Sequence, residues 1–422
     1  MQSAGRLGSG IRGGAVRMFD SLSEKQFRFL WFGMIFSMAA MQMNIVTRSW
    51  LAYDLTGSAL MLGLVAAARA LPQLLLAPLS GVVADRYDKR MILLISQSAL
   101  VIFALVAALL VQFDLMTVWL LAALSLAQGV AFPFTMPVRT ALVPDLVRDS
   151  QINNAMALDS TGRNINRVLA PAIAGVLIAW SPVLAFYGIV VFYVFGVLTL
   201  RGLPKGLVGG APKKGTFAQM GVGFQYIWAR RDLFALIAMA FITVILGMPF
   251  QQLLPVFQVD VLDVGPRQLG FMFTAVGLGA ILGSLVAAFL SESPQLARLQ
   301  IAAGVAFGLA LVVFALATDF VLSLVMLVIV GFFSQGYLTI NRILVIQRTE
   351  REFYGRVMSV YMMTWSLVPL AMLPIGVLVD WFGVSVTLAV SGVALAIVVT
   401  CVALSFSSIY LSKQQQPQPS AG

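Results

Sequence analysis

Long apolar stretches, most of them 20 residues or more and separated by short polar connections, run through this chain from residue 27 to residue 408. Of its 422 residues, 60% are hydrophobic and only 10% are charged, whereas a soluble domain carries about 25% charged residues. A helix needs about 20 apolar residues to cross the hydrocarbon core of a bilayer. The stretches are therefore expected to cross a membrane.

Because lipid offers backbone N–H and C=O groups no partners, a membrane span is either an α-helix or a strand of a closed barrel. The stretches are too long for barrel strands, which have about 10 residues. We therefore predict an all-α membrane protein with twelve transmembrane helices in two six-helix bundles. The predicted spans are 27–50, 60–83, 91–111, 117–138, 152–179, 183–201, 232–256, 267–290, 299–317, 320–345, 356–380 and 385–408.

The charges alternate along the chain. Basic residues precede the first span and fill the even-numbered connections, while the odd-numbered connections are mainly acidic, as at Asp54 and Asp114. Basic loops stay on the cytoplasmic side, so the prediction is a multi-pass protein of the cell membrane with both termini cytoplasmic. The net charge of +10 then reflects topology and contact with membrane lipids rather than nucleic-acid binding.

The chain has no histidine, and Cys401 is its single cysteine. No disulfide can form within it, and neither a transition-metal site nor a histidine-based catalytic group is expected. We predict that the protein has no cofactor and is not an enzyme.

Five parts follow from the composition. Residues 1–26 form a cytoplasmic extension in which Met18 is an alternative start, 27–201 the first bundle, 232–410 the second, and 411–422 a tail. The connection 202–231 opens with Gly, Pro and Lys. It continues with apolar residues spaced by three and four, which predicts an amphipathic helix on the membrane surface.

The second connection, GVVADRYDKR, places five charges between two apolar spans. Its pattern resembles the signature loop of the major facilitator superfamily, which joins the second and third helices. The resemblance implies that the loop latches one conformational state; alternatively, its charges only mark the cytoplasmic side. The residues carrying the pattern are Gly81, Asp85, Arg86, Lys89 and Arg90.

The two halves resemble copies of one another. TGSALMLG at the second span matches DVGPRQLG at the eighth, and Arg139 near the end of the fourth span matches Arg342 near the end of the tenth. The two offsets are 207 and 203 residues. Parallel repeats of this kind build major facilitator transporters, which hold substrate near the bilayer midplane.

Within the superfamily, LTGSALMLGLVAAARALPQLLLAPLSGVVADR and PVRTALVPDLVRDSQINNAMALDSTGRNINRVLAPAIAG resemble the enterobactin-exporter and macrolide-efflux branch. This resemblance implies proton-coupled export of a drug-like or siderophore-like small molecule; the alternative is an importer or facilitator. Three positions depart from the family pattern. Ala170 and Ala174 replace glycines in the fifth span, and Ser125 stands where the fourth span usually has an arginine.

Charged residues within spans are expensive to bury and indicate function. Asp159, Arg163 and Arg167 follow one another at intervals of four and share one helix face. They form either a proton-coupling site or an ion pair that ties the fifth helix to its neighbours.

Polar residues on the first, second, fourth, seventh and tenth spans are candidates for lining a substrate cavity, although Arg48 could instead extend to the membrane interface. The predicted partners are a small-molecule substrate, protons and lipids, and the protein is expected to be a monomer. The cavity candidates are Asn44, Arg48, Arg69, Gln128, Gln251, Gln252, Gln335 and Asn341.

Overall fold

The computed structural model describes residues 20–204, 206 and 216–405; the side chains of 77, 78, 81, 82, 84, 85, 216–220, 365 and 366 lie outside this description. In the described part, eleven helices are long and apolar enough to cross a membrane. The predicted all-α membrane class is therefore confirmed. Helix α7 (Ile152–Trp180) occupies the fifth predicted span, but its polar stripe keeps it out of the eleven, so the count of twelve stays a prediction.

Two compact units make up the chain. Unit 1 comprises Met1–Thr56 and Ala68–Lys214, and unit 2 comprises Gly57–Ala67 and Gly215–Gly422. Helix α3 (Ala59–Arg86) begins in unit 2 and continues in unit 1, because its first turns pack on α15 (Tyr354–Phe382), where a Cβ on Gly376 would lie 2.7 Å from the Ala59 carbonyl oxygen. The predicted domain boundaries stay a prediction.

Unit 1 contains one interrupted span. The fourth span is broken by the 3-10 turn η2 (Phe132–Phe134), where Pro133 removes a backbone donor. Besides α3 and α7, the elements are η1 (Asp20–Ser23), α2 (Lys25–Thr56), α4 (Lys89–Gln112), α5 (Val118–Ala131), α6 (Met136–Leu146), η3 (Asp149–Gln151) and α8 (Pro182–Leu200).

Unit 2 contains one further interrupted span. Here α10 (Arg231–Leu246) ends before Gly247, and Pro249 precedes α11 (Phe250–Asp260). The other helices are α9 (Thr216–Ala229), α12 (Pro266–Phe289), α13 (Leu296–Ala315), α14 (Phe320–Arg348) and α16 (Val384–Ser405).

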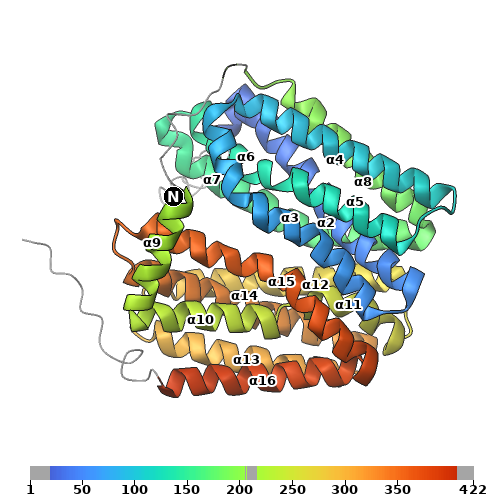
Figure 1. Ribbon diagram of the computed structural model, residues 1–422, viewed down its shortest axis with the longest axis vertical. Coiled ribbons are helices and arrows are strands. Elements are labelled where there is room, and N and C mark those ends of the chain that lie inside the picture. The colour runs from blue at the N-terminus through green and yellow to red at the C-terminus, as the bar shows by residue number, and fades with distance from the viewer. Residues whose placement is uncertain (1–19, 205, 207–215, 406–422) are drawn as a thin grey trace, which may run out of the picture. The chain divides into compact units, whose positions relative to one another are not determined.

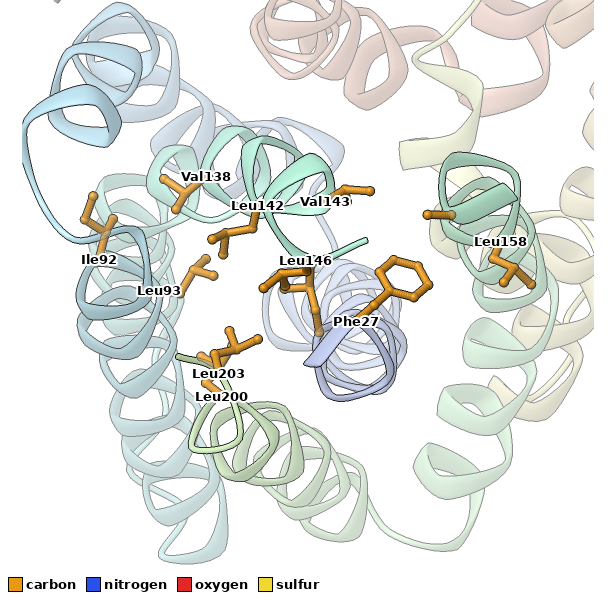
Figure 2. Packing of buried hydrophobic residues seen from close by; sticks show 12 residues of the cluster. Phe27, Ile92, Leu93, Val138, Leu142, Val143, Leu146, Leu158, Leu200 and Leu203 are labelled. Carbon is orange, nitrogen blue, oxygen red and sulfur yellow. The ribbon is translucent and has the colours of Figure 1, made fainter. Parts of the chain in front are cut away.

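Apolar side chains close one end of unit 1, where the first turns of α2 and α4 meet α6 and the last turn of α8. Figure 2 shows Phe27, Leu93, Leu142 and Leu200 packed toward one another there. Each is at most 2% exposed. Dispersion contacts among such closely packed side chains stabilise this end of unit 1.

Glycines let helices of unit 2 approach closely. A Cβ on Gly279 of α12 would lie 1.9 Å from the Val328 carbonyl oxygen of α14, and one on Gly331 would lie 2.3 Å from the Val276 oxygen. Helices α13 and α16 run side by side (Figure 1), with Gly308 against Gly392. Small residues at helix contacts are typical of membrane bundles, where close packing replaces the hydrophobic effect.

Candidate functional site

Two basic residues of the signature loop, Lys89 and Arg90, bind groups of other helices in unit 1. Asp88 caps α4 by accepting a hydrogen bond from the Arg90 backbone N–H at 2.9 Å. The Lys89 ammonium lies 2.6 Å from Asp145 Oδ2 at the end of α6. Arg90 donates to the carbonyl oxygens of Leu200 and Arg201, both at 3.3 Å, where α8 ends. The loop therefore ties α4 to the ends of α6 and α8.

The other members of the predicted latch are Gly81, Asp85 and Arg86. Arg86 is exposed, and the side chains of Gly81 and Asp85 lie outside the described part of the chain. A latch role for the loop stays a prediction. Asp88, which sequence reasoning counted only as a charge, is the residue that fixes the loop on α4.

Asp159 is the only acidic side chain among the described residues that is buried, at 8% exposure. It accepts a hydrogen bond from Arg163 Nη1 one turn further along α7, and it lies close enough to Arg139 of α6 to attract that guanidinium. Arg167 is partly buried two turns beyond Asp159. The predicted charged stripe thus lies within the electrostatic reach of a third cation, which another helix supplies.

Arg139 is the centre of a buried polar group that joins three helices of unit 1. Its Nη1 donates to the Leu30 carbonyl oxygen of α2 at 3.4 Å, and its Nη2 donates to Ser37 Oγ at 3.3 Å. Ser37 in turn donates to Gln97 Oε1 of α4 at 2.8 Å. These bonds hold α2, α4 and α6 in one register.

Unit 2 repeats this arrangement with different side chains. Asn341 of α14 donates to the Leu236 carbonyl oxygen of α10 at 2.9 Å. Tyr337 donates to the Met239 carbonyl oxygen at 3.3 Å, and Thr243 and Gln300 lie next to its hydroxyl. A predicted cavity residue, Asn341, is therefore 0% exposed and serves as a link between helices.

The helix starts define which positions correspond. Helix α5 begins at 118 and α14 at 320, and α2 begins at 25 and α10 at 231. Arg139 therefore corresponds to Asn341, and Leu30 to Leu236. The predicted match of Arg139 with Arg342 stays a prediction, and Arg342 is exposed.

A second group of cations lies deeper in unit 1. Arg48 of α2 is 8% exposed and donates from Nη1 to Ser125 Oγ at 3.2 Å. The guanidinium carbon of Arg69 lies 5.0 Å from the centre of the Phe132 ring, a cation–π distance. Arg69 comes this close to α5 because Gly129 has no Cβ; one there would lie 2.2 Å from the Arg69 carbonyl oxygen.

The hydroxyl of Tyr193 on α8 lies within the electrostatic reach of both Arg48 and Arg69. Tyr193 and Phe132 also line a small cavity with Ser37, Gln97 and Arg139. Its volume of about 10 Å³ admits about one water molecule. Sequence reasoning missed Tyr193 and Phe132 because an aromatic residue in a span gives no signal of its neighbours.

The remaining cavity candidates divide between the units. Asn44 and Gln128 of unit 1 are buried, and Asn44 Oδ1 has no hydrogen-bond partner. Gln251, Gln252 and Gln335 of unit 2 are partly buried. Ser125, noted for replacing an arginine, instead accepts a hydrogen bond from one, since the guanidinium of Arg48 reaches it from α2.

The chain is similar to known transporters over most of its length. The family model described as "Transmembrane secretion effector" matches residues 17–420. The staphyloferrin A transporter of Staphylococcus aureus is 25% identical over 350 residues, which cover 82% of this chain and 87% of that protein. Macrolide efflux protein A of Streptococcus pyogenes is 23% identical, covering 84% and 88%. The enterobactin exporter EntS of Salmonella typhi is 25% identical, covering 75% and 74%.

Solved structures agree on the fold. The nucleoside transporter NupG matches with a TM-score of 0.73 at 16% identity, covering 92% of this chain and 100% of that one. A bacterial homologue of the lysosomal transporter Spinster matches with a TM-score of 0.75 at 13% identity, covering 93% and 99%. At these identities the likeness concerns the fold alone.

The two helical units contain buried polar links between their helices. The family match runs along nearly the whole chain, and the relatives include efflux proteins. These findings indicate one class of protein. The protein is a multi-pass membrane transporter of small molecules, and the predicted resemblance is confirmed. The chain belongs to the transmembrane secretion effector family of the major facilitator superfamily.

Proposed function

We propose that this transporter exports an amphipathic small molecule from the cell by alternating access, in exchange for protons. The observation that carries the proposal is the buried carboxylate of Asp159 between two arginines of unit 1. Relatives named for the efflux of macrolides and the export of enterobactin support the direction.

Proton exchange requires a group that binds a proton on one side of the membrane and releases it on the other. A buried carboxylate is protonated more readily when its positive neighbours withdraw, and less readily when they approach. Asp159 is bonded to Arg163 of its own helix and attracts Arg139 of α6. A movement of α6 relative to α7 would separate Asp159 from this second positive neighbour.

The direction of export depends on topology. Cytoplasmic termini follow from the charges of the connections, and they place Leu115 outside and Gln295 inside the cell. Both residues are exposed. In a Cys401→Ala background, an impermeant thiol reagent added to whole cells should label Leu115→Cys and spare Gln295→Cys. The reverse labelling would overturn this topology.

The function is tested with purified protein in liposomes and two fluorescent amphipaths of opposite charge, 8-anilinonaphthalene-1-sulfonate and rhodamine 6G. With an acidic lumen, exchange for protons should concentrate at least one of them above the level in protein-free liposomes. A protonophore should abolish the excess.

The direction of the pH gradient that drives accumulation distinguishes export from import and from facilitated diffusion. Accumulation that requires an alkaline lumen would indicate proton-coupled import, and equilibration without accumulation would indicate a facilitator. Either result, or the absence of protein-dependent flux, would contradict the proposal.

A further inference from the structure

Among the described residues, Arg48 and Arg69 of unit 1 lack a counter-charge such as Lys89 and Arg163 possess. Lys89 pairs with Asp145, and Arg163 pairs with Asp159. Within the described part of the chain, Arg48 and Arg69 take part in no ion pair. The neighbouring groups whose charge acts on Arg48 are Arg69 and Tyr193.

The hydrogen bonds of the two guanidinium groups are also incomplete. A guanidinium has five N–H donors. The hydrogen bond of Arg48 is to Ser125 Oγ, and the Nε of Arg69 is enclosed without a hydrogen-bond partner. A buried charge that is neither paired nor fully hydrogen-bonded is expensive, and two like charges that repel each other increase the cost. Such an arrangement indicates a partner that the chain itself does not supply.

We propose that Arg48 and Arg69 bind the anionic group of the transported molecule, a carboxylate, sulfonate or phenolate; this rests on the proposed function. Guanidinium groups form strong, directional hydrogen bonds to such oxyanions. The two arginines come from α2 and α3, and the hydroxyl of Tyr193 on α8 lies beside them. One anion would offset the repulsion between the two cations.

The apolar part of the same molecule has a matching surface next to the arginines. Phe132, which lies under Arg69, also lines the small cavity with Met38, Met41 and Met136. Methionine side chains are unbranched and readily change conformation, so a cavity of about 10 Å³ can widen for an apolar ring. The site therefore fits an amphipathic anion better than a cation of the same shape.

The purified protein in nanodiscs of zwitterionic lipid provides the test, with empty discs as background. Two probes share one ring system: 8-anilinonaphthalene-1-sulfonate carries a negative charge, and N-phenyl-1-naphthylamine lacks the sulfonate. Saturable binding of the sulfonate should be at least about tenfold tighter than binding of the neutral amine. Equal affinity for the two probes in the unmodified protein would overturn the proposal without any variant.

Variants then locate the site. Arg48→Gln and Arg69→Gln should each weaken sulfonate binding about tenfold and leave binding of the neutral probe unchanged, while the Lys variants keep a preference for the sulfonate. Arg201→Gln, which removes an exposed charge at the end of α8, should change neither. Sulfonate binding that survives both Gln substitutions would overturn the proposal.

Stability distinguishes a binding role from a structural one. Without ligand, Arg48→Gln should melt at the same temperature as the unmodified protein or higher, because it removes an uncompensated charge. Ser125 keeps a partner, since its hydroxyl donates to the Leu121 carbonyl oxygen at 2.6 Å. A melting temperature several degrees lower would assign Arg48 to packing and overturn its binding role.

Equilibrium binding needs no proton gradient, so the two proposals fail separately. Charge-selective binding without gradient-driven flux would overturn proton-coupled export and leave the anion site in place. Gradient-driven flux of rhodamine 6G alone, with no charge-selective binding, would overturn the anion site and leave the exporter.

Discussion

The carboxylate of Asp380, at the end of α15, binds the first turn of α3: its Oδ1 accepts a hydrogen bond from the Ala59 backbone N–H at 2.7 Å. Its Oδ2 accepts one from Ser58 Oγ at 2.6 Å. Asp380 and Ala59 both belong to unit 2, although 321 positions separate them in the sequence. The first N–H groups of a helix have no partner within it, and a carboxylate there also offsets the helix dipole.

Removing this cap should loosen the start of α3. Asp380→Ala should lower the free energy of unfolding by about 0.5–2 kcal/mol, the usual cost of losing a helix cap. It should also speed amide hydrogen exchange at residues 59–62. Asp319, which caps its own helix α14 through the Leu322 N–H at 2.8 Å, supplies the control. Asp319→Ala should cost a similar amount but leave exchange at 59–62 unchanged, and equal protection in both variants would refute the role of Asp380.

Lys89 and Asp145 should behave as a coupled pair. The side chain of Lys89 is only 10% exposed and that of Asp145 is 37% exposed. Asp145→Asn leaves a buried ammonium without its counter-charge and should destabilise the protein by about 1–3 kcal/mol. Lys89→Met should cancel much of that loss in the double variant, as measured by denaturant unfolding in detergent. Strictly additive losses would show that the two charges do not interact.

Substitution of Asp85 should change transport rather than stability, unlike the substitutions of Lys89 and Asp145. If it holds a latch, Asp85→Asn shifts the populations of the conformational states. Probe flux in liposomes should then fall at least about tenfold, while the unfolding free energy changes by less than about 0.5 kcal/mol. Normal flux in a stable Asp85→Asn protein would leave the acid of this loop as a marker of membrane sidedness.

Gly279 should be among the least replaceable residues of unit 2. The Cβ of Gly279→Ala would lie 1.9 Å from a backbone oxygen of α14, and since backbone cannot rotate away, the two helices must separate. We expect a loss of more than about 2 kcal/mol of unfolding free energy. Gly355 has open space at its Cβ position, so Gly355→Ala should be neutral or slightly stabilising. A thermally normal Gly279→Ala protein would contradict the observed helix packing.

The spans could be predicted from the sequence because a segment that crosses lipid must be apolar. The hydropathy of its residues shows this directly. The helix ends and breaks at Pro133 and Pro249 are expected, because proline lacks the backbone N–H that a continuous helix needs. The contact of Asp380 with α3 gave no signal in the sequence, because it joins residues more than 300 positions apart.

The candidate site was predictable only in part. Hydropathy identified Arg48, Asp159 and Arg163 as costly charges, but their neighbours depend on how each helix is rotated. One residue of rotation separates buried Asn341 from exposed Arg342, and hydropathy alone does not distinguish the two positions. Ser125 stands where the family usually has an arginine, and it accepts a hydrogen bond from Arg48 of α2.

Coupling between substrate and protons is tested most directly by letting a substrate gradient move protons. Liposomes containing the protein and the pH-sensitive dye pyranine are loaded with the probe that the protein concentrates best, and are diluted into probe-free buffer with no initial pH difference. Probe leaving the lumen should draw protons in, so the lumen of the unmodified protein acidifies. Asp159→Asn should release the probe without a change in pH. Rapid probe release from the unmodified protein at constant lumen pH would contradict proton-coupled export.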